Sequence, residues 1–448
     1  MLVMRLKVMV KKILLTFMIL LTPAVFGENV GDINGDGSIN IADVVYLFKH
    51  LRDVGIEKGD LNCDDSVDIA DVVYLFNNIQ QWSQPVVFAK NFEIEYYDAN
   101  GNPVGYNDNW AYKIVTTKYG NAVYNKYCIL RKGDKPSSNL PSDVKVIHTP
   151  VKKVATLSAI QVAMLEALND DNVKKSIRGV SKSIYKKIKD YGVFPDLRPY
   201  IDNGNIVSIG TWSSIDKDVL LSISPDIVFI PWTHGYLVED INTVSDLGLN
   251  YLVTVESNEP TFLGKAEWAK VYAAFYNLDD KGNDFLQKVW KKRNDLIRIT
   301  RNADYRPKVA MLYWSPYSGP WVYCAQNCYA KLVTEFKGDY MFKDIPGTSY
   351  VNLDKETTLE HLQGCEVFIY MNWNSLKEPM DTLEELKEKR PDLAPILDHA
   401  KRVYVSKYNY AYDGYVNMDL LMEDFARMIH PECFDGGDSE LHYFKKLK

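Results

Sequence analysis

Residues 215–230 read IDKDVLLSISPDIVFI, and this stretch carries the pattern that decides the fold. Its first part, IDKDVLLSI, has the spacing of apolar residues that is typical of an amphipathic helix. Its second part continues as SPDIVFIPW, a turn followed by an apolar run. An uninterrupted run of this kind is typical of a strand that is buried on both faces of a parallel sheet. The stretch therefore predicts one helix–strand repeat of an α/β fold.

The segments on either side repeat this alternation. Upstream are the strand-like VKKVATLS and NIVSIG and the helical AIQVAMLEALND, and downstream is DLGLNYLVTV. The same alternation resumes in KVAMLYW, CYAKLVTEF, APILDHAKRVYVS and the helical MDLLMEDFARMIHPECF. Between the two series, residues 263–303 show no strand pattern, and residues 283–300 predict a long amphipathic helix. We therefore predict two α/β lobes with parallel sheets, residues 148–262 and 304–448, joined by helices.

The order of these segments resembles that of the class III periplasmic binding proteins, which serve ABC importers of iron-siderophores, haem and cobalamin. IDKDVLLSISPDIVFI looks like the family's helix–Pro-Asp–strand phrase, and KETTLEHLQGCEVFIY at 355–370 looks like its echo in the second lobe, without the Pro-Asp. The segment ILDHAKRVYVSKYNYAYDGYVNMDLLMEDFARMIHPECF is also similar to the carboxy terminus of that family. The resemblance covers roughly residues 148–435. It implies two Rossmann-like lobes, a stiff helical hinge and modest lobe closure.

The resemblance also implies how the chain meets a transporter. Members of the family dock on their permease through one acidic residue on each lobe. Each of these acids forms ion pairs with arginines of the permease. The matching positions are Asp218, where the family usually has Glu, and Glu356. A carboxylate pairs with a guanidinium through two hydrogen bonds, so both residue types suit this role. The alternative is that both acids simply favour the first turn of a helix through its dipole.

Aromatic residues gather in segments that we expect to follow strand ends, where open α/β sheets bind ligands. The candidate ligand-binding residues are Trp212, Trp232, His234, Trp314, Trp321, Tyr350 and Tyr410. Trp212 and Tyr350 each lie six residues before a docking acid, and Trp212 matches a cleft tryptophan of cobalamin-binding members. Large flat ligands are held by rigid aromatic faces, although any one of these rings could instead belong to the core. Histidine is scarce in these segments, which disfavours direct binding of Fe³⁺, and arginine that would pair with an anionic siderophore or a haem propionate is scarce as well. This composition favours a corrinoid or a neutral chelate.

A repeated acidic phrase precedes the α/β region. Residues 31–51 read GDINGDGSINIADVVYLFKHL, and residues 59–79 read GDLNCDDSVDIADVVYLFNNI. The oxygen donors recur at loop positions 1, 3, 5, 7, 9 and 12, as an EF-hand-type calcium loop requires. They are Asp32, Asn34, Asp36, Ser38, Asn40 and Asp43 in the first copy, and Asp60, Asn62, Asp64, Ser66, Asp68 and Asp71 in the second. We expect two bound Ca²⁺ ions, with weaker binding in the second loop, where Asp65 replaces the Gly37 of the first.

Each acidic loop leads into an amphipathic IADVVYLF helix, and this loop-then-helix pair resembles a type I dockerin. The resemblance covers residues 30–80 and implies a small all-α calcium-binding domain, which we assign to residues 28–84. It also implies a cohesin-domain partner. The partner-facing positions would be Ile41, Ala42, Ile69 and Ala70, which are more apolar than the Ser/Thr pairs common in that family.

The remaining features of the sequence indicate the cellular location and limit the class of protein. Residues 1–27 combine a basic start, an apolar run and small residues at a cleavage site, which predicts a secretory signal peptide and a location at the cell surface or outside it. Whether this segment is cleaved or kept as an anchor stays open. Residues 85–147 alternate apolar and polar residues and predict a small β-rich region. A net charge of −7 argues against nucleic acid as a partner.

Six cysteines are scattered along the chain, and only Cys324 and Cys328 form a close pair. Buried thiols are favoured for that pair over a metal or disulfide role. No set of nucleophile and base indicates an enzyme, so we expect a monomeric binding protein that captures a metal-chelate for an ABC importer. The alternative is a cell-surface assembly or adhesion component whose main role is the dockerin interaction.

Overall fold

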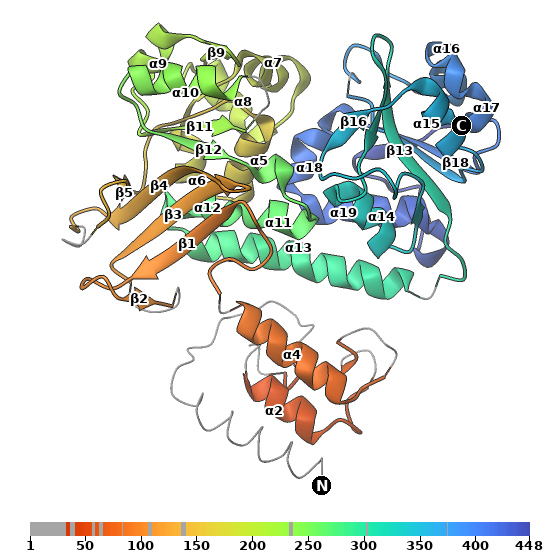
Figure 1. Cartoon of the computed structure of the whole chain (residues 1–448), viewed down its shortest axis with the longest axis horizontal. Coiled ribbons are helices and arrows are strands. Elements are labelled where there is room, and N and C mark those ends of the chain that lie inside the picture. The colour runs from red at the N-terminus through yellow and green to blue at the C-terminus, as the bar shows by residue number, and fades with distance from the viewer. Residues whose placement is uncertain are drawn as a thin grey trace. The chain divides into compact units, whose positions relative to one another are not determined.

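The structure is a computed structural model, which describes residues 33–35, 41–55, 59–61, 66–82, 84–105, 110–135, 140–232, 236–301, 303–373 and 375–448. The chain divides into two compact units. The first comprises Met1–Pro85 with Gly105–Asn109, and the second comprises Val86–Val104 with Trp110–Lys448. Figure 1 labels the helices and strands of both. The expected signal peptide lies outside the described residues.

The first unit contains the helices α2 (Ile41–Lys49) and α4 (Ile69–Trp82). They are the two copies of the IADVVYLF phrase, and their apolar faces form one small core. Its buried members are Ile33, Val44, Leu47, Leu61, Val72 and Leu75. Equivalent residues of the two copies pack together, as the apolar spacing of the repeat predicts.

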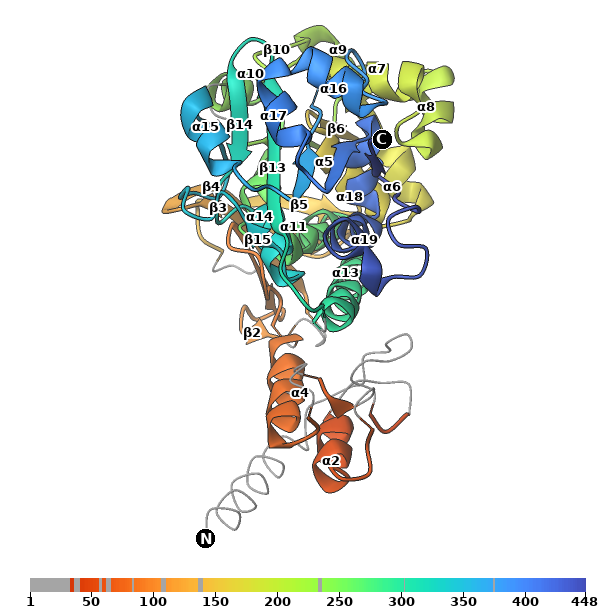
Figure 2. The same cartoon turned by 90° about the vertical axis from the view of Figure 1, so that its right-hand side faces the viewer.

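The second unit is organised around a long helix, α13 (Asp279–Thr300), which runs beneath both lobes in Figure 1 and is seen nearly end-on beside α19 in Figure 2. Two short helices precede it, α11 (Phe262–Glu267) and α12 (Ala269–Ala274). Gly282 allows α13 to approach α12, because a Cβ at this position would lie 2.9 Å from Lys270 Cα. These helices occupy the segment that the sequence predicts to be helical. Among the described residues, no helix has the length and apolar character needed to cross a membrane.

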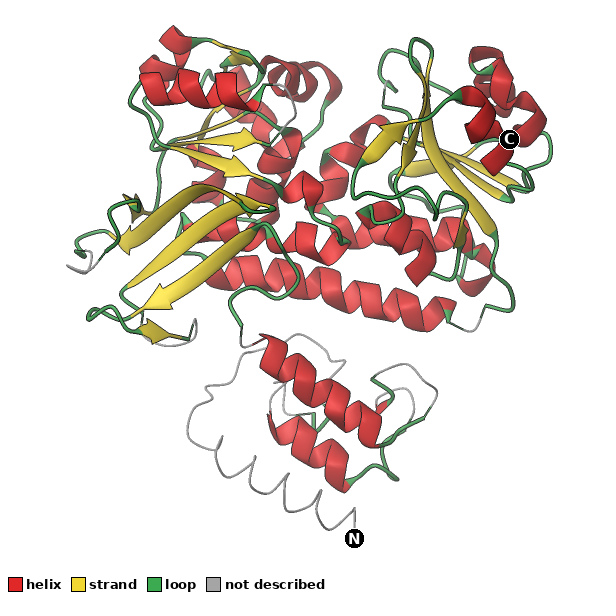
Figure 3. Ribbon diagram, in the orientation of Figure 1, coloured by secondary structure: helices red, strands yellow, loops and turns green. Residues whose placement is uncertain are grey.

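A five-stranded sheet precedes the lobes, and Figure 3 shows it in yellow beside the first lobe. Its order is β2-β1-β3-β4-β5, and only the β4–β5 pair is parallel. The strands are β1 (Phe92–Tyr97), β2 (Pro103–Val104), β3 (Tyr112–Tyr119), β4 (Ala122–Arg131) and β5 (Lys145–Thr149). The fully buried Lys113 reaches Asp279 of α13 at 2.6 Å. Tyr127 donates a hydrogen bond to the carbonyl of Tyr251 at 2.9 Å. These contacts make the sheet part of the second unit.

The first lobe contains a five-stranded sheet in which every pair of strands is parallel, as the sequence predicts. Its order is β12 (Tyr251–Thr254), β11 (Ile227–Pro231), β6 (Val154–Thr156), β7 (Ile177–Val180) and β8 (Val207–Ser208). The helices are α5 (Ala159–Ala167), α6 (Asp171–Ser176), α7 (Lys182–Tyr191), α8 (Arg198–Asp202), α9 (Lys217–Ile223) and α10 (Leu237–Asp246), with the 3₁₀ turns Pro195–Leu197 and Glu256–Asn258. A small hairpin of β9 (Gly210–Thr211) and β10 (Ser214–Ile215) leads into α9.

The deciding stretch 215–230 folds into α9 and β11. Asp216 caps the helix by accepting a hydrogen bond from Val219 N, and Ser224 ends it with a left-handed backbone, φ 48°. The carboxylate of Asp226 then accepts hydrogen bonds from the backbone of Lys152 and Lys153 at 2.6 and 2.9 Å. The Asp of the Pro-Asp phrase therefore holds the residues just before β6 next to the start of β11. All residues of β11 are buried.

The second lobe differs from our prediction, because its sheet is mixed rather than parallel. The order is β16 (Tyr350–Asn352), β14 (Gly319–Tyr323), β13 (Lys308–Ser315), β17 (Val367–Tyr370), β18 (Arg402–Ser406) and β19 (Phe444–Lys446), with β15 (Asp339–Tyr340) also paired to β13. Strands β13, β17 and β18 are parallel, whereas β14, β16 and β19 run antiparallel to their neighbours. For β14 the reason is local, since SPYSGP forms a tight turn in which Ser315 pairs with Gly319.

Helices and 3₁₀ turns complete the second lobe. They are α14 (Cys328–Glu335), α15 (Lys355–His361), α16 (Leu383–Lys389), α17 (Ala394–Leu397), α18 (Asp413–Val416) and α19 (Met418–Ile429), with 3₁₀ turns at Pro391–Leu393, Tyr408–Ala411 and Pro431–Cys433. Glu366 takes the place of Asp226 in the second lobe, because its carboxylate accepts a hydrogen bond from Lys308 N at 2.9 Å. The echo at 355–370 therefore keeps the anchoring carboxylate although it lacks the Pro-Asp.

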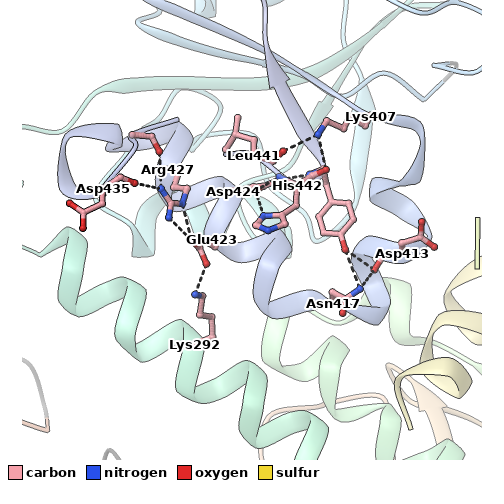
Figure 4. Close-up of polar contacts among 12 residues, drawn as sticks. Lys292, Lys407, Asp413, Asn417, Glu423, Asp424, Arg427, Asp435, Leu441 and His442 are labelled. Atoms are coloured by element: carbon pink, nitrogen blue, oxygen red, sulfur yellow. Dashed lines mark hydrogen bonds and ion pairs between the residues drawn. The ribbon is translucent and has the colours of Figure 1, made fainter. Parts of the chain in front are cut away.

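Side chains of α19 fix the linker helix to the second lobe. Lys292 of α13 forms an ion pair with Glu423, which also pairs with Arg427 at 2.8 Å (Figure 4). One turn earlier, Lys288 pairs with Asp419 at 2.9 Å. The joining helix is therefore held along its length and not only at its ends.

Candidate functional site

Five aromatic side chains of the second lobe form one group, which we call the second-lobe aromatic cluster: Tyr313, Trp321, Tyr323, Tyr350 and Trp373. They come from β13, β14, β16 and the loop after β17. Strand pairing places Tyr313 opposite Trp321 and Tyr323 opposite Tyr350. Because side chains of directly paired residues point to the same face of a sheet, this register brings the rings together.

Trp373 lies at the centre of the cluster. Its ring stacks on Tyr313 with centroids 4.8 Å apart and an interplanar angle of 30°, and it meets Tyr350 at 4.8 Å and 57°. Its indole nitrogen donates a hydrogen bond to the hydroxyl of Tyr323 at 3.1 Å. Trp321 joins through an edge contact with Tyr350 at 5.8 Å and 76°. These contacts fix the ring orientations, so the cluster is a rigid apolar surface.

Parts of this surface remain open to solvent. Tyr350 is 49% exposed and Trp373 is 37% exposed. At the tip of the β13–β14 turn, Tyr317 is 96% exposed. Exposed faces on rings whose orientation is already fixed are what a large conjugated ligand needs for stacking.

The electrostatics beneath the cluster leave it nearly neutral. Burial raises the pKa of Tyr323 well above its usual value, and burial also raises the pKa of Tyr313. Both phenols therefore stay protonated at neutral pH, which disfavours direct binding of Fe³⁺ by phenolate. The nearby Arg390 is neutralised by Glu378, which accepts its guanidinium through two hydrogen bonds at 3.0 and 2.7 Å.

In the first lobe, Trp212 lies in the β9–β10 turn and is 41% exposed. Its indole nitrogen donates to the carbonyl of Leu157 at 2.8 Å, which fixes the ring. Trp232 follows β11 directly and is half-buried. Its nitrogen donates to the Tyr124 hydroxyl at 2.7 Å, and its ring lies 4.4 Å from that of Tyr119. Trp232 is therefore partly covered by the β region.

Two predicted ligand-binding residues are part of the core instead. Trp314 is 3% exposed, because β13 continues through Ser315 and turns this side chain inward. Tyr410 is 7% exposed and packs near Phe444, with centroids 6.2 Å apart. Its hydroxyl also interacts with Tyr323 and Trp373 of the second-lobe aromatic cluster. We expected both residues on open loops, whereas both are buried, and only Tyr410 lies against the cluster. His234 lies outside the described residues.

Trp373 was missing from the prediction although the sequence contains a signal for it. It lies in the loop after the buried strand VFIY of β17, and Trp232 comes directly after IVFIP of β11. Of the predicted residues, the structure brings Trp321 and Tyr350 together in the second-lobe aromatic cluster. Trp212 and Trp232 belong to the first lobe and are not members of that cluster.

The two predicted docking acids occupy equivalent positions. Asp218 lies in the first turn of α9, and Glu356 lies in the first turn of α15. Both are exposed. In each lobe the residue two positions earlier is an Asp that caps the helix, and Asp354 accepts from Thr357 N at 2.8 Å. This hydrogen bond lowers the pKa of Asp354. The exposed acid therefore follows a cap that is itself ionised.

The repeat of the first unit is only partly described, since Asp32, Asp36, Ser38, Asn40, Asn62 and Asp64 lie outside the described residues. At position 12 of each loop, the fully buried Asp43 and Asp71 hold the loop backbone. Asp43 accepts from Asn34 N at 3.1 Å, and Asp71 accepts from Leu61 N at 2.7 Å and Asp68 N at 2.9 Å.

Asp43, Asp60 and Asp71 are all buried, and a buried carboxylate needs hydrogen bonds or an opposite charge. Ser66 donates to Asp68 at 3.3 Å. No group of three or more His, Cys, Asp or Glu side chains within metal-binding range occurs among the residues that the structure describes, but half of the predicted ligands are not among them.

The predicted partner-facing residues of the repeat are mostly accessible. Ala42, Ile69 and Ala70 are exposed, whereas Ile41 packs against the core of the first unit. Elsewhere, Cys324 and Cys328 are both buried and unbridged, which agrees with the interpretation of them as buried thiols.

Comparison with known proteins identifies relatives over most of the chain. No protein-family model matches. The uncharacterized lipoprotein MJ0878 of Methanocaldococcus jannaschii is 31% identical over 375 residues, covering 80% of this chain and 84% of that protein. The uncharacterized lipoprotein MJ0872 of the same organism is 31% identical over 339 residues, covering 73% and 81%.

Solved structures share the fold. The TroA-like periplasmic binding protein FepB from Veillonella parvula matches with a TM-score of 0.50 and 13% identity, covering 79% of this chain and all of that one. A periplasmic heme-binding protein from Pseudomonas aeruginosa matches with a TM-score of 0.50 and 11% identity, covering 66% and 98%. The α/β part of the chain therefore has the fold of TroA-like periplasmic binding proteins.

Proposed function

We propose a function for this chain, which belongs to the family of the Methanocaldococcus jannaschii lipoproteins MJ0878 and MJ0872, from its fold and its aromatic cluster. We propose that it is an extracellular solute-binding protein that captures a metal-chelate and delivers it to an ABC importer. The fold of periplasmic binding proteins supports a binding role rather than catalysis. The names of the lipoprotein relatives and of the periplasmic proteins with this fold agree with a location outside the cytoplasmic membrane.

The observation that carries this proposal is the second-lobe aromatic cluster. Its rings are locked by stacking and by the hydrogen bond from Trp373 to Tyr323, yet Trp373 and Tyr350 keep open faces. A preorganised neutral aromatic surface suits a ligand with a broad conjugated face, because little conformational entropy is lost on binding. The ligand class is therefore a corrinoid, a haem or a siderophore complex of low charge.

The test is titration of the purified full chain with cobalamin, haemin and a neutral ferric siderophore, followed by intrinsic fluorescence and calorimetry. We expect quenching, because Trp373 and Trp321 would contact a strongly absorbing ligand. Trp373→Ala should weaken binding by about tenfold, since an aromatic contact contributes about 0.5–1.5 kcal/mol beyond its buried area.

Tyr305→Ala is the matched control, because Tyr305 is an exposed aromatic residue outside the cluster. Its affinity should equal that of the wild-type protein. If none of the chelates binds, or if Trp373→Ala binds as tightly as the control, the aromatic cluster is not the ligand site.

The repeat of the first unit supports a second role. We propose that it is a dockerin-like module that binds two Ca²⁺ ions and attaches the protein to a cohesin-domain partner. The support is the matching placement of Asp43 and Asp71, each buried and each holding its own loop. Exposed apolar residues at Ile69 and Ala70 suit contact with a protein partner.

Calorimetric titration of the calcium-depleted chain measures the number of sites, which should be two. Asp43→Asn should remove the first site, because position 12 supplies a charged oxygen ligand. Asp53→Asn, at an exposed acid just beyond α2, is the control and should bind two ions. Equal calcium binding by Asp43→Asn and the wild-type protein would exclude this loop as a site.

A further inference from the structure

A cavity of about 480 Å³ lies at the hinge, away from the second-lobe aromatic cluster. The first lobe contributes the end of α5, Lys174 of α6 and Asp196. The linker contributes α13, and the second lobe contributes the junction of α18 and α19. Lining residues include Glu166, Leu168, Asp284, Phe285 and Val416. We call it the hinge cavity. Its volume lies within the range of small-molecule sites, about 300–1,000 Å³.

The lysines that line the hinge cavity are already paired. The pairs are Lys174 with Asp196, Lys281 with Asp170 at 3.2 Å, and Lys288 with Asp419 at 2.9 Å. Lys281 also donates to the carbonyl of Asn169 at 2.8 Å. These positive charges are therefore neutralised by the protein, which argues against an anion as the ligand.

Glu166 is the buried carboxylate of the lining that forms no close ion pair among the described residues. It is 8% exposed, and its Oε1 atom has no hydrogen-bond partner among the described residues. Burial is the main cause that raises the pKa of Glu166 to about 7; the nearby Lys174 ammonium opposes the rise, and Asp196 and Asp413 contribute to it. Asp284 lines the same cavity from α13, and burial together with Asp280 raises its pKa. Both carboxyl groups would gain from a nearby cation.

The walls between these carboxylates are partly apolar. Leu168, Phe285 and Val416 offer hydrocarbon surface beside the two acids. A hard divalent ion would need about six oxygen ligands, whereas two carboxylates and an apolar wall suit an ammonium group on a methylene stem. Asn417, also in the lining, is fixed by hydrogen bonds at 3.2 Å to the carbonyl of Asp413 and to the hydroxyl of Tyr443 (Figure 4).

We propose that the hinge cavity binds a small organic dication of the α,ω-diamine class. One ammonium group donates to Glu166, the other lies near Asp284, and the methylene stem packs on Phe285. The ligand would contact both lobes and the helix that joins them. A change in lobe position on binding of either ligand would couple this cavity to a second ligand site. By linkage, each ligand would then change the affinity for the other by the same factor.

Calorimetry of the full chain with 1,4-diaminobutane at pH 8 and constant calcium tests this. We expect one site, and Glu166→Gln should weaken it by about tenfold or more, because it removes a charge-assisted hydrogen bond. Asp284→Asn should weaken it less, since Asp284 is exposed. Asp190→Asn, an exposed acid on α7 outside the lining, should bind as the wild-type protein does.

Glu166→Gln should remain folded, because it replaces a buried charge by a neutral side chain of equal size, and circular dichroism verifies this. The neutral analogue 1,4-butanediol should not bind, and butylamine should bind more weakly than the diamine. Equal binding of the diol, wild-type affinity in folded Glu166→Gln, or no binding of the diamine at millimolar concentration would each overturn the proposal. So would Glu166-dependent binding of Mg²⁺ in place of the diamine.

Discussion

Replacing Glu256 by glutamine should reduce the dependence of stability on pH. Glu256 follows β12 and is 1% exposed. Neither of its carboxylate oxygens has a hydrogen-bond partner of ordinary geometry among the described residues. Burial raises its pKa to about 7, although the nearby Thr254 hydroxyl and the Lys265 ammonium partly lower it. The charged form of Glu256 is therefore costly in the folded protein.

The sign and the size of the effect follow from linkage. In the unfolded chain the carboxyl loses its proton near pH 4.5, whereas the folded protein keeps it to about pH 7. Between these values the folded state binds more protons, so the free energy of unfolding falls as the pH rises. The difference between these two pKa values corresponds to roughly 3 kcal/mol at most. This stabilising contribution is complete below pH 4.5 and is lost by pH 7.

Chemical denaturation at pH 5 and pH 8, followed by tryptophan fluorescence, measures the change. Every tryptophan except Trp82 lies in the second unit, so the signal reports mainly on the unit that contains Glu256. The difference in unfolding free energy between the two pH values should be about 2–3 kcal/mol smaller in Glu256→Gln than in the wild-type protein. Glu360→Gln, at an exposed site on α15, should keep the wild-type difference. The same pH dependence in Glu256→Gln and in the wild-type protein would refute the reasoning.

Three further changes test other parts of the structure. Glu267→Gln should destabilise the second unit by about 3 kcal/mol or more, because this buried carboxylate accepts hydrogen bonds from the backbone of residues 87–89. The segment around residues 87–89 should become open to protease, and an unchanged cleavage rate would contradict this. Gly282→Ala should cost about 1–3 kcal/mol in denaturation, since its Cβ would meet the α12 backbone, and wild-type stability would show that the helices separate easily. Asp218→Arg combined with Glu356→Arg should abolish uptake in transport assays while leaving chelate affinity unchanged, because both acids are exposed on helix starts; equal losses of affinity and uptake would place them at the ligand site.

The sequence predicts those parts of this fold that depend on local pattern. The helix–Pro-Asp–strand phrase, the parallel sheet of the first lobe and the long joining helix all follow from the period of apolar residues and from a family resemblance built on it. The sequence does not reveal the β13–β14 hairpin, because the aromatic residues on both sides of SPYSGP also fit a loop that follows a strand end. The positions of Trp314 and Tyr410 are hidden from the sequence for a different reason. Their burial depends on contacts with residues distant in the sequence, and no local pattern reports those contacts.

The contacts of the joining helix bear on how the protein can bind a ligand. Lys113 of the β region holds the start of α13 through Asp279, and ion pairs from the middle of α13 hold it to α19. The lobes also meet directly, since Phe194 N donates to the carboxylate of Asp413 at 2.9 Å. A large rotation of one lobe against the other would break several of these interactions at once. The proposed metal-chelate would therefore be recognised by surfaces that already have their final shape, and such surfaces bind without a large ordering cost. The second-lobe aromatic cluster, whose central Trp373 is fixed by stacking and by a hydrogen bond, meets that requirement.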